Sequence, residues 1–260
     1  MGASGDKMTR ITIVTACLNN ATVIKTAIAA VSSQTYPDVE HVIVDGGSTD
    51  GTVDVIRTWA AKAGGRAKWI SEPDTGLYDA LNKGIRLATG EIVGVLHADD
   101  FYARPDVLEK VAKVFEATGA EAVYADVRFV DAADTTRTVR YVSGKKFRPW
   151  MMRYGFMPPH PTIFCRRELF ERLGYYRTDY RISADHELMI RFLWKAGIRT
   201  AYLPEAIITM RTGGMSTRSA RARWLACREN VRACRENGIY ANLPMQLAKY
   251  AMKVFEFVRR

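Results

Sequence analysis

The chain has 260 residues, and 48% of them are hydrophobic, which is enough to bury a substantial core within one large α/β domain. Its four cysteines, at positions 17, 165, 227 and 234, include no CxxC pair and show no disulfide-type framework. This cysteine usage favours a reducing, cytoplasmic setting over a secreted one. Residues 1–7 are too polar for a signal peptide, and no apolar run reaches the ~18–20 residues of a membrane span.

The net charge of +10 is concentrated towards the C-terminus. Residues 211–260 carry eleven Arg or Lys side chains against three Glu, a surplus of +8, which leaves residues 1–210 at +2. A basic tail on a nearly neutral body suggests an anionic partner for the tail, such as phospholipid, pyrophosphate or nucleic acid.

The first part of the chain alternates short apolar runs with amphipathic stretches, which predicts a parallel sheet covered by helices. We expect strands at residues 10–16, 41–44, 68–70 and 92–96. We expect helices after Asn19 or Asn20 as N-cap, at 52–63 with Ser48 or Asp50 as cap, and at 77–88 with Gly90 as C-terminal cap.

After residue 126 the pattern changes to antiparallel and mixed elements. A hairpin is expected from residues 127–131 and 138–142, with further strands at 161–165, 199–203 and 207–210 and helices at 167–173 and 185–195. Apolar residues then recur at helical spacing to give a narrow seam, which Gly238 ends, and Pro244 opens a last helix. The seam residues are Ala220, Trp224, Cys227, Val231 and Cys234.

The predicted fold class is therefore α/β: a doubly wound, mainly parallel sheet with a smaller antiparallel element and C-terminal amphipathic helices. Two acidic clusters follow predicted strands directly, at Asp45–Asp50 and at His97–Asp100. In open α/β sheets, ligands bind beyond the carboxyl ends of the strands. Carboxylates at two such ends suit a divalent cation and the nucleotide diphosphate that it neutralises.

Seven motifs, taken in order, resemble the family 2 glycosyltransferases of the GT-A fold. They are IVTACLN (13–19), VDGGSTDGT (44–52), SEPDTGLYDALNKG (71–84), HADD (97–100), PHPTIF (159–164), SADHEL (183–188) and GGMS (213–216). The third motif looks most like enzymes that build bacterial surface polysaccharides and glycolipids. The resemblance covers roughly residues 10–217.

The resemblance implies an inverting, metal-dependent glycosyltransferase that moves a sugar from a nucleotide-sugar donor, with UDP favoured, to a hydroxyl of a glycan or lipid-linked acceptor. The implied cofactor is Mn²⁺ or Mg²⁺. The implied organisation is an extension at 1–9, a GT-A domain at 10–217 with a nucleotide-sugar half (10–126) and an acceptor half (127–217), and a basic helical tail at 218–260.

The basic tail admits two interpretations, a solvated face of an ordinary helix or an anchor on an anionic membrane surface. We favour the anchor, so the expected location is cytoplasmic with a peripheral position on the inner face of the plasma membrane. No nucleic-acid partner is expected.

The resemblance also assigns residues to the donor. The implied nucleotide-sugar contacts are Thr15 and Ala16 through backbone groups, Asp45, Asp74, Lys83, His97, Ala98, Asp99 and Arg211. Arg211, Gly213, Gly214 and Ser216 resemble a loop that closes over the donor diphosphate. The alternatives are a helix cap for Asp45 and an i,i+4 ion pair between Asp79 and Lys83.

The metal is expected at Asp99 and Asp100, because Mg²⁺ and Mn²⁺ take hard oxygen ligands and complete their shell with water and phosphate. The family's usual motif is Asp-x-Asp, and here His97 occupies the first acidic position. Asp99 matches the acid that touches the metal in the family. A neutral His97 can still hydrogen-bond a ribose hydroxyl or ligate Mn²⁺.

Asp185 matches the acid that serves as general base in inverting members of the family. A base of this kind takes the proton from the attacking sugar hydroxyl. Asp185 also suits a helix N-cap, and the two roles are compatible. His160 and Glu187 are weaker candidates for an acceptor or diphosphate contact.

Two other functions compete. A sugar-nucleotidyltransferase shares the topology, but such enzymes resemble one another through a Gly-x-Gly-Thr-Arg loop where this chain has Ala16–Asn19. A non-enzymatic membrane- or nucleic-acid-binding module would use the basic tail but leaves the acidic clusters unexplained, because carboxylates repel phosphate unless a cation intervenes.

Overall fold

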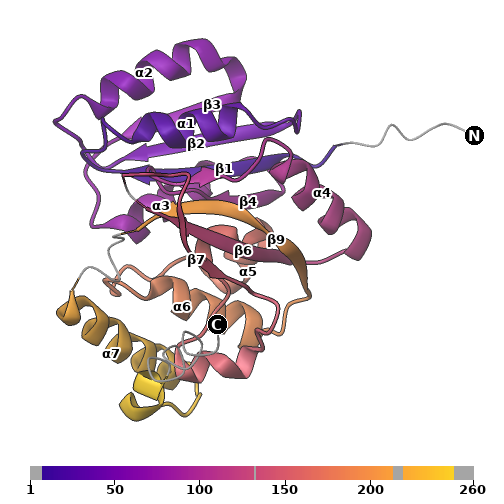
Figure 1. Ribbon diagram of the computed structural model, residues 1–260, viewed down its shortest axis with the longest axis vertical. Coiled ribbons are helices and arrows are strands. Elements are labelled where there is room, and N and C mark those ends of the chain that lie inside the picture. Colours follow the sequence, from indigo (N-terminus) through magenta and orange to yellow (C-terminus); the bar gives the residue numbers. More distant parts are fainter. Residues whose placement is uncertain (1–7, 132, 213–218, 249–260) are drawn as a thin grey trace, which may run out of the picture.

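Nine strands form one mixed sheet in the computed structural model, which describes residues 8–131, 133–212 and 219–248. The strand order is β3-β2-β1-β4-β8-β6-β9-β5, and β7 pairs with β6. Helices cover both faces of this sheet (Figure 1). The α/β class with a mainly parallel sheet and a smaller antiparallel part is therefore confirmed.

The parallel part holds the N-terminal strands β1 (Ile11–Cys17), β2 (Val39–Asp45), β3 (Ala67–Ser71) and β4 (Ile92–Val95). They alternate with helices α1 (Ile24–Ser32), α2 (Thr52–Ala63) and α3 (Leu77–Leu87), and a 3-10 turn (Gly64–Arg66) precedes β3. Every residue of β1 and β2 is buried, as expected of strands with helices on both faces. The four predicted strands are confirmed within one or two residues.

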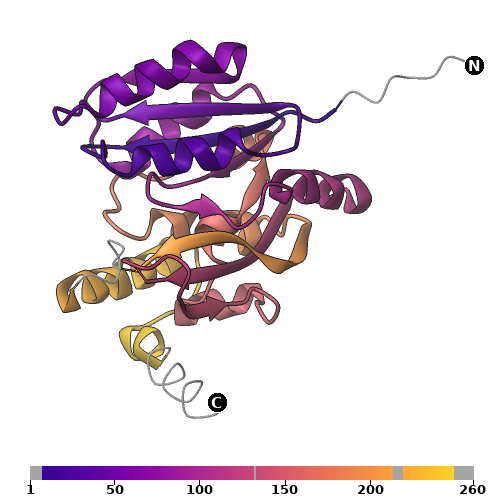
Figure 2. The same ribbon diagram turned by 45° about the horizontal axis from the view of Figure 1, so that its top comes forward.

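Successive residues of β1 and β2 point to opposite faces of the sheet, which divides the packing between two layers. Val14 and Val44 pack with Ile85 of α3, whereas Ile43 packs with Ile24 of α1 in a separate cluster that also includes part of α2. In Figures 1 and 2, α2 and the C-terminal helix α7 (Ala220–Glu236) lie at opposite ends of the molecule.

The predicted caps in this half were wrong. The N-cap of α1 is Val23, and Asn19 instead crosslinks two loops: its side-chain oxygen accepts from the backbone N–H of Thr49 at 3.0 Å. The N-cap of α2 is Gly51, in the left-handed region, rather than Ser48 or Asp50, although Asp50 Oδ1 accepts from the backbone N–H of Thr52, the first residue of the helix, at 3.0 Å. Gly90 is not a helix cap. It lies where the chain passes close to β1, because a Cβ there would lie 2.6 Å from the Thr12 hydroxyl oxygen.

The second half adds strands β5 (Phe101–Tyr102), β6 (Ala122–Val130), β7 (Thr138–Val142), β8 (Phe164–Arg166) and β9 (Thr200–Arg211). Its helices are α4 (Val107–Thr118), α5 (Glu168–Leu173) and α6 (Ala184–Met189), which continues as a π-helix (Ile190–Lys195). Two 3-10 turns lie at Pro149–Tyr154 and His160–Thr162.

The predicted hairpin is confirmed by the antiparallel β6–β7 pair. The strands predicted at 199–203 and 207–210 are a single strand, β9, which runs parallel to β6. The register shifts where Leu203 pairs with Ala125 and Ala206 with Asp126, so a bulge absorbs the residues between the two predicted strands.

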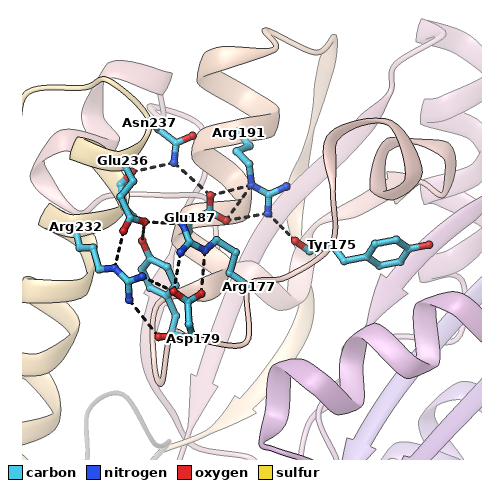
Figure 3. A network of polar contacts seen from close by, with 10 residues as sticks. Tyr175, Arg177, Asp179, Glu187, Arg191, Arg232, Glu236 and Asn237 are labelled. Atoms are coloured by element: carbon cyan, nitrogen blue, oxygen red, sulfur yellow. Dashed lines mark hydrogen bonds and ion pairs between the residues drawn. The ribbon is translucent and has the colours of Figure 1, made fainter.

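Helix α7 packs on the domain. Cys227, Val231 and Cys234 of the predicted seam are buried, whereas Trp224 is 48% exposed. Polar contacts add to this packing (Figure 3): Glu236 pairs with Arg177 at 2.6 Å and with Arg232 at 2.8 Å. Buried apolar contacts and partly exposed ion pairs therefore make α7 part of the globular fold.

The chain turns after α7 at Gly238, whose φ of 76° favours glycine, and becomes helical again at 243–248. The remainder of the predicted last helix lies outside the described residues. Among the described helices, none combines the length and hydropathy needed to cross a membrane.

Candidate active site

A pocket of about 400 Å³ opens beyond the carboxyl ends of β1 and β4, the position expected for a ligand in an open α/β sheet. Eight of the thirteen site residues predicted from the sequence line it. They are Ala16, His97, Ala98, Asp99, Asp100, His160, Asp185 and Arg211. Residues from both halves of the chain therefore meet in one place.

The acidic turn after β4 forms one wall of the pocket. The backbone N–H of Asp100 donates to the carbonyl of His97 at 3.1 Å, which closes the turn. Asp99 is exposed, whereas Asp100 is 1% exposed and its Oδ2 atom has no hydrogen-bond partner among the described residues. Burial, together with the neighbouring Asp99 carboxylate, raises the pKa of Asp100 well above its usual range.

Arg211, at the end of β9, supplies positive charge beside this turn. Its Nη1 atom donates to the carbonyl of Asp99 at 2.9 Å, and its charge acts to lower the pKa of Asp100. Gly213, Gly214 and Ser216, predicted to form a closing loop with Arg211, lie outside the described residues.

The acidic turn fits a divalent cation. A desolvated carboxylate oxygen without a donor is what a cation would satisfy, and Asp100 Oδ2 is such an atom. In the part of the chain that the structure describes, no three His, Cys, Asp or Glu side chains gather into a metal cage. Two carboxylates completed by water and substrate phosphate are a usual arrangement for Mg²⁺.

Asp185 lines the pocket from the first turn of α6. Its Oδ1 atom accepts a hydrogen bond from the backbone N–H of His186 at 2.7 Å. Burial raises the pKa of Asp185 to about 6, although the His186 N–H and the nearby His97 act to lower it. A carboxylate with this pKa can exchange a proton near neutral pH.

Glu187 requires a correction. Residues two apart on a helix point to nearly opposite sides, and Glu187 faces away from Asp185 into the domain, where it pairs with Arg191 at 2.8 Å and accepts from Asn237 (Figure 3). Glu187 is only 2% exposed. This position argues against the predicted acceptor or diphosphate contact.

Two histidine rings line the same pocket as Asp99, Asp100 and Asp185. The ring centroids of His97 and His160 are 6.2 Å apart, and His160 Nε2 lies 2.7 Å from the hydroxyl of Tyr176. Burial lowers the pKa of each histidine to about 4, so both rings are neutral at pH 7. They can exchange hydrogen bonds with a ligand without adding charge.

Asp45 and Thr15, both predicted donor contacts, are completely buried and do not line the pocket. Asp45 accepts hydrogen bonds from the backbone N–H of Ser48 at 2.9 Å and the hydroxyl of Ser71 at 2.7 Å. Although burial opposes it, this bonding lowers the pKa of Asp45. The Thr15 hydroxyl lies 3.0 Å from His41 Nε2. The Asp45 side chain therefore holds the loop after β2, and the Thr15 side chain links β1 to β2, rather than forming the pocket surface.

Asp74 and Lys83 also lie outside the pocket lining. Asp74 accepts from the backbone N–H of Gly76 at 2.8 Å. Lys83 Nζ lies 2.8 Å from Glu72 but 3.8 Å from Asp79, so the predicted i,i+4 pair is the weaker of its two ion pairs. These residues hold the turn that leads into α3.

Sequence reasoning did not single out Tyr78 and Arg181, which both line the pocket. Tyr78 stacks on Tyr176 at 5.7 Å and donates its hydroxyl to the carbonyl of Ile182. It therefore ties α3 to the segment before Asp185. The helical spacing of Leu77, Tyr78 and Leu81 was the available signal for this wall.

Comparison with known proteins places the chain among sugar-transferring enzymes. Residues 12–174 match the family described as "Glycosyl transferase family 2". A "PGL/p-HBAD biosynthesis glycosyltransferase" of Mycobacterium tuberculosis is 34% identical over 206 residues, which cover 78% of this chain and 78% of that protein.

Solved structures show the same fold at low identity. The "Mannosyltransferase PcManGT from Pyrobaculum calidifontis in complex with GDP-Man and Mn2+" superposes with a TM-score of 0.67 at 23% identity, over 93% of this chain and 68% of that one. S. aureus TarS 1-349 gives a TM-score of 0.64 at 16% identity, over 86% of this chain and 65% of that one. This chain thus spans slightly less than two thirds of that TarS structure.

Proposed function

Because the chain belongs to glycosyl transferase family 2 and is a glycosyltransferase, we propose that it transfers a sugar with inversion from a nucleotide sugar to a hydroxyl of a glycan or lipid-linked acceptor. Two structural neighbours solved with nucleotide sugars support such a donor: TarS 1-349 in complex with UDP-GlcNAc and PcManGT in complex with GDP-Man. A UDP-sugar remains the favoured donor.

One observation carries the proposal: Asp185 and the Asp99–Asp100 turn line the same pocket but have different environments. The base of an inverting transfer must be able to accept a proton near neutral pH, from the side opposite the leaving group. The pKa of about 6 for Asp185 suits that role. The acidic turn with Arg211 suits the diphosphate.

Each remaining side chain then has a task in the transfer. Asp99 and Asp100 would hold Mn²⁺ or Mg²⁺, and Arg211 would pair with donor phosphate. When bound, the cation neutralises the charge that develops on the leaving diphosphate. Neutral His97 and His160 orient hydroxyl groups of the donor or acceptor, and Tyr78 keeps the segment before Asp185 in place.

Differential scanning fluorimetry with a panel of UDP-, GDP- and dTDP-sugars, each with and without Mn²⁺, tests the donor part. We expect one nucleotide class to raise the melting temperature, and Mn²⁺ to increase that rise. Proton NMR of the product formed from that donor then reads the anomeric configuration. A retained configuration, or stabilisation that is indifferent to Mn²⁺, contradicts the inverting or the metal-dependent part respectively.

We also propose that the C-terminal region rests on an anionic membrane surface. Trp224, Tyr240 and Leu247 are exposed at 48%, 69% and 44%, next to a helix rich in arginine. Exposed aromatic and basic side chains are typical of interfacial binding. Full-length protein should co-sediment with phosphatidylglycerol vesicles at low salt, less at high salt, and not with phosphatidylcholine vesicles. Equal sedimentation with both lipids contradicts the proposal.

A further inference from the structure

A second groove, of about 780 Å³, adjoins the active-site pocket. Leu77, Tyr78, Arg181 and Ile182 line both cavities, so these four residues form a shared wall. Asp99, Asp100 and Arg211 line only the first cavity. The groove therefore adjoins the pocket at the segment that precedes Asp185, and Asp99, Asp100 and Arg211 of the predicted diphosphate site are not part of its lining.

One face of α7 builds the far wall of this groove. Arg221, Trp224, Leu225 and Arg228 line it, at spacings of three, one and three residues. Residues at i, i+3, i+4 and i+7 share one side of a helix. The groove therefore receives a stripe with cationic ends and an aromatic and aliphatic centre.

Among the residues that the structure describes, the cations of the groove have no anionic partner. Arg181, Arg221 and Arg228 are exposed, and none of the three forms an ion pair with another residue that the structure describes. Arg232, one turn further along α7, is by contrast paired with Asp179 and Glu236.

The groove offers little negative charge to these arginines. Asp79 is the one acidic side chain among the described lining residues, and its carboxylate already accepts from the backbone N–H of Thr75 at 3.1 Å and lies 3.8 Å from Lys83. Three guanidinium groups against one engaged carboxylate favour an anionic occupant. Trp224, at 48% exposure, and Leu225 offer it apolar contact.

We propose that this groove binds the part of the acceptor that does not react, and that this part is a phosphate-bearing amphiphile. The inference rests on the proposed glycosyl transfer and names its acceptor class. The phosphate contacts Arg221 and Arg228, the apolar portion lies on Trp224 and Leu225, and the sugar hydroxyl extends along Arg181 and Ile182 to Asp185. Guanidinium groups pair with phosphate through two parallel hydrogen bonds, which fixes orientation as well as charge.

The position of Glu229 supports this coupling between groove and base. Glu229 follows Arg228 on α7, and its carboxylate accepts from the backbone N–H groups of Arg181 and Ile182 at 2.9 Å each. The helix that carries the groove thus holds the segment that leads to Asp185. An acceptor seated on α7 is consequently placed at a fixed distance from the base.

Isothermal titration with n-octyl phosphate as probe tests the proposal, with inorganic phosphate and uncharged n-octyl glucoside as the two comparison ligands. Wild-type protein should bind octyl phosphate more tightly than either comparison ligand. The double variant Arg221→Gln/Arg228→Gln should bind octyl phosphate at least about tenfold more weakly, because it loses charge-assisted hydrogen bonds. Trp224→Ala should weaken it through lost apolar contact.

Arg223→Gln is the matched control, since Arg223 is exposed on the same helix but does not line the groove. It should leave octyl phosphate binding unchanged. Equal binding of octyl phosphate by the double variant and the wild type overturns the proposal. Equal affinity for inorganic phosphate and octyl phosphate also overturns it, because the groove would then be a simple anion site.

If the same residues of α7 contact a membrane instead, the experiment gives a different result. If octyl phosphate does not bind but phosphatidylglycerol vesicles do, and the double variant loses only the vesicles, then the stripe is a membrane contact and the acceptor assignment is wrong. Failure of the glycosyl-transfer proposal would appear separately, as absent stabilisation by every nucleotide sugar with Mn²⁺ while octyl phosphate binding persists.

Discussion

The carboxylate of Glu229 accepts a hydrogen bond from the backbone N–H of Ser183 at 2.9 Å, two residues before Asp185. The same carboxylate binds the N–H groups of Arg181 and Ile182, so one side chain of α7 satisfies three consecutive backbone donors of this segment. Glu229 is 7% exposed, and buried backbone N–H groups need an acceptor, which its carboxylate supplies. The position of the proposed base therefore depends on a residue outside the family match at 12–174.

Replacing Glu229 by Gln should destabilise the protein and slow transfer together. The amide keeps one acceptor oxygen and turns the other into a donor that faces backbone N–H groups, which leaves buried donors unsatisfied at a cost of about 1–3 kcal/mol. Urea unfolding and steady-state kinetics measure the two effects. Glu236→Gln is the control on the same helix, because Glu236 pairs with surface arginines and should change stability by less than about 1 kcal/mol and turnover hardly at all. Equal turnover in both variants contradicts the positioning role.

The N-terminal strands could be predicted because the residues of each run favour a strand by themselves. The runs that became β1, β2 and β4 are rich in β-branched and apolar residues, so the positions of these strands could be predicted from the residues alone. The join of 199–203 with 207–210 into β9 was not predictable, because Pro204 and Glu205 read as a break. Pairing with β6 holds the two pieces in one strand across a bulge.

The site was predictable as a set of motifs but not as a surface. Which carboxylate faces the pocket depends on side-chain direction, which is fixed only when the elements pack. Asp45 and Asp99 both follow strands, yet Asp45 turns into its own loop while Asp99 faces the pocket. The seam on α7 was likewise visible, but whether Cys227 and Val231 meet a membrane or the domain was decided by tertiary packing.

Asp100 should lower the stability of the metal-free protein and contribute to metal binding. The raised pKa of Asp100 means that the folded state holds its proton more tightly than the unfolded state, so this residue costs stability increasingly as the pH rises above 3.8. Asp100→Asn removes that cost and should raise the metal-free melting temperature at pH 7, with a smaller difference near pH 4. The same variant should lose the additional stabilisation that Mn²⁺ gives with the donor.

Asp99→Ala separates these two effects. Asp99 is exposed, so the variant should fold normally while transfer and donor hydrolysis are abolished. Circular dichroism and activity with the identified donor measure both. Turnover near the wild-type value would remove Asp99 from the metal site, and an unchanged metal-free melting temperature in Asp100→Asn would show that Asp100 is not strained by burial.

Glu40 should contribute to acid resistance at the end of the sheet away from the pocket. Burial acts to raise its pKa, but hydrogen bonds from Lys68 at 2.8 Å, Thr12 at 2.6 Å and Thr89 at 2.8 Å outweigh it and lower the pKa to about 2. The stability it contributes is present above its ordinary value of 4.5 and is lost as the pH falls towards 2. Glu40→Gln should therefore destabilise by about 1–3 kcal/mol at pH 7 and progressively less between pH 4.5 and pH 2. Glu116→Gln is the control, because Glu116 is exposed and its variant should change the free energy of unfolding at pH 7 by less than about 0.5 kcal/mol. A pH-independent loss in Glu40→Gln would contradict the assignment.

The proposed base makes the sharpest prediction, because its pKa lies within the working range of the assay. Asp185 must be ionised to accept the acceptor proton, so kcat/KM should rise with pH through about 6 and level off above it. Asp185→Asn should retain donor affinity, lower turnover by ~10² or more, and lose this acid limb. His160→Gln is the matched control: His160 lines the same pocket with a pKa near 4, so its variant should keep the limb near 6 whatever its turnover. If the limb persists in Asp185→Asn, or if donor affinity collapses with turnover, Asp185 is a binding residue and the base lies elsewhere.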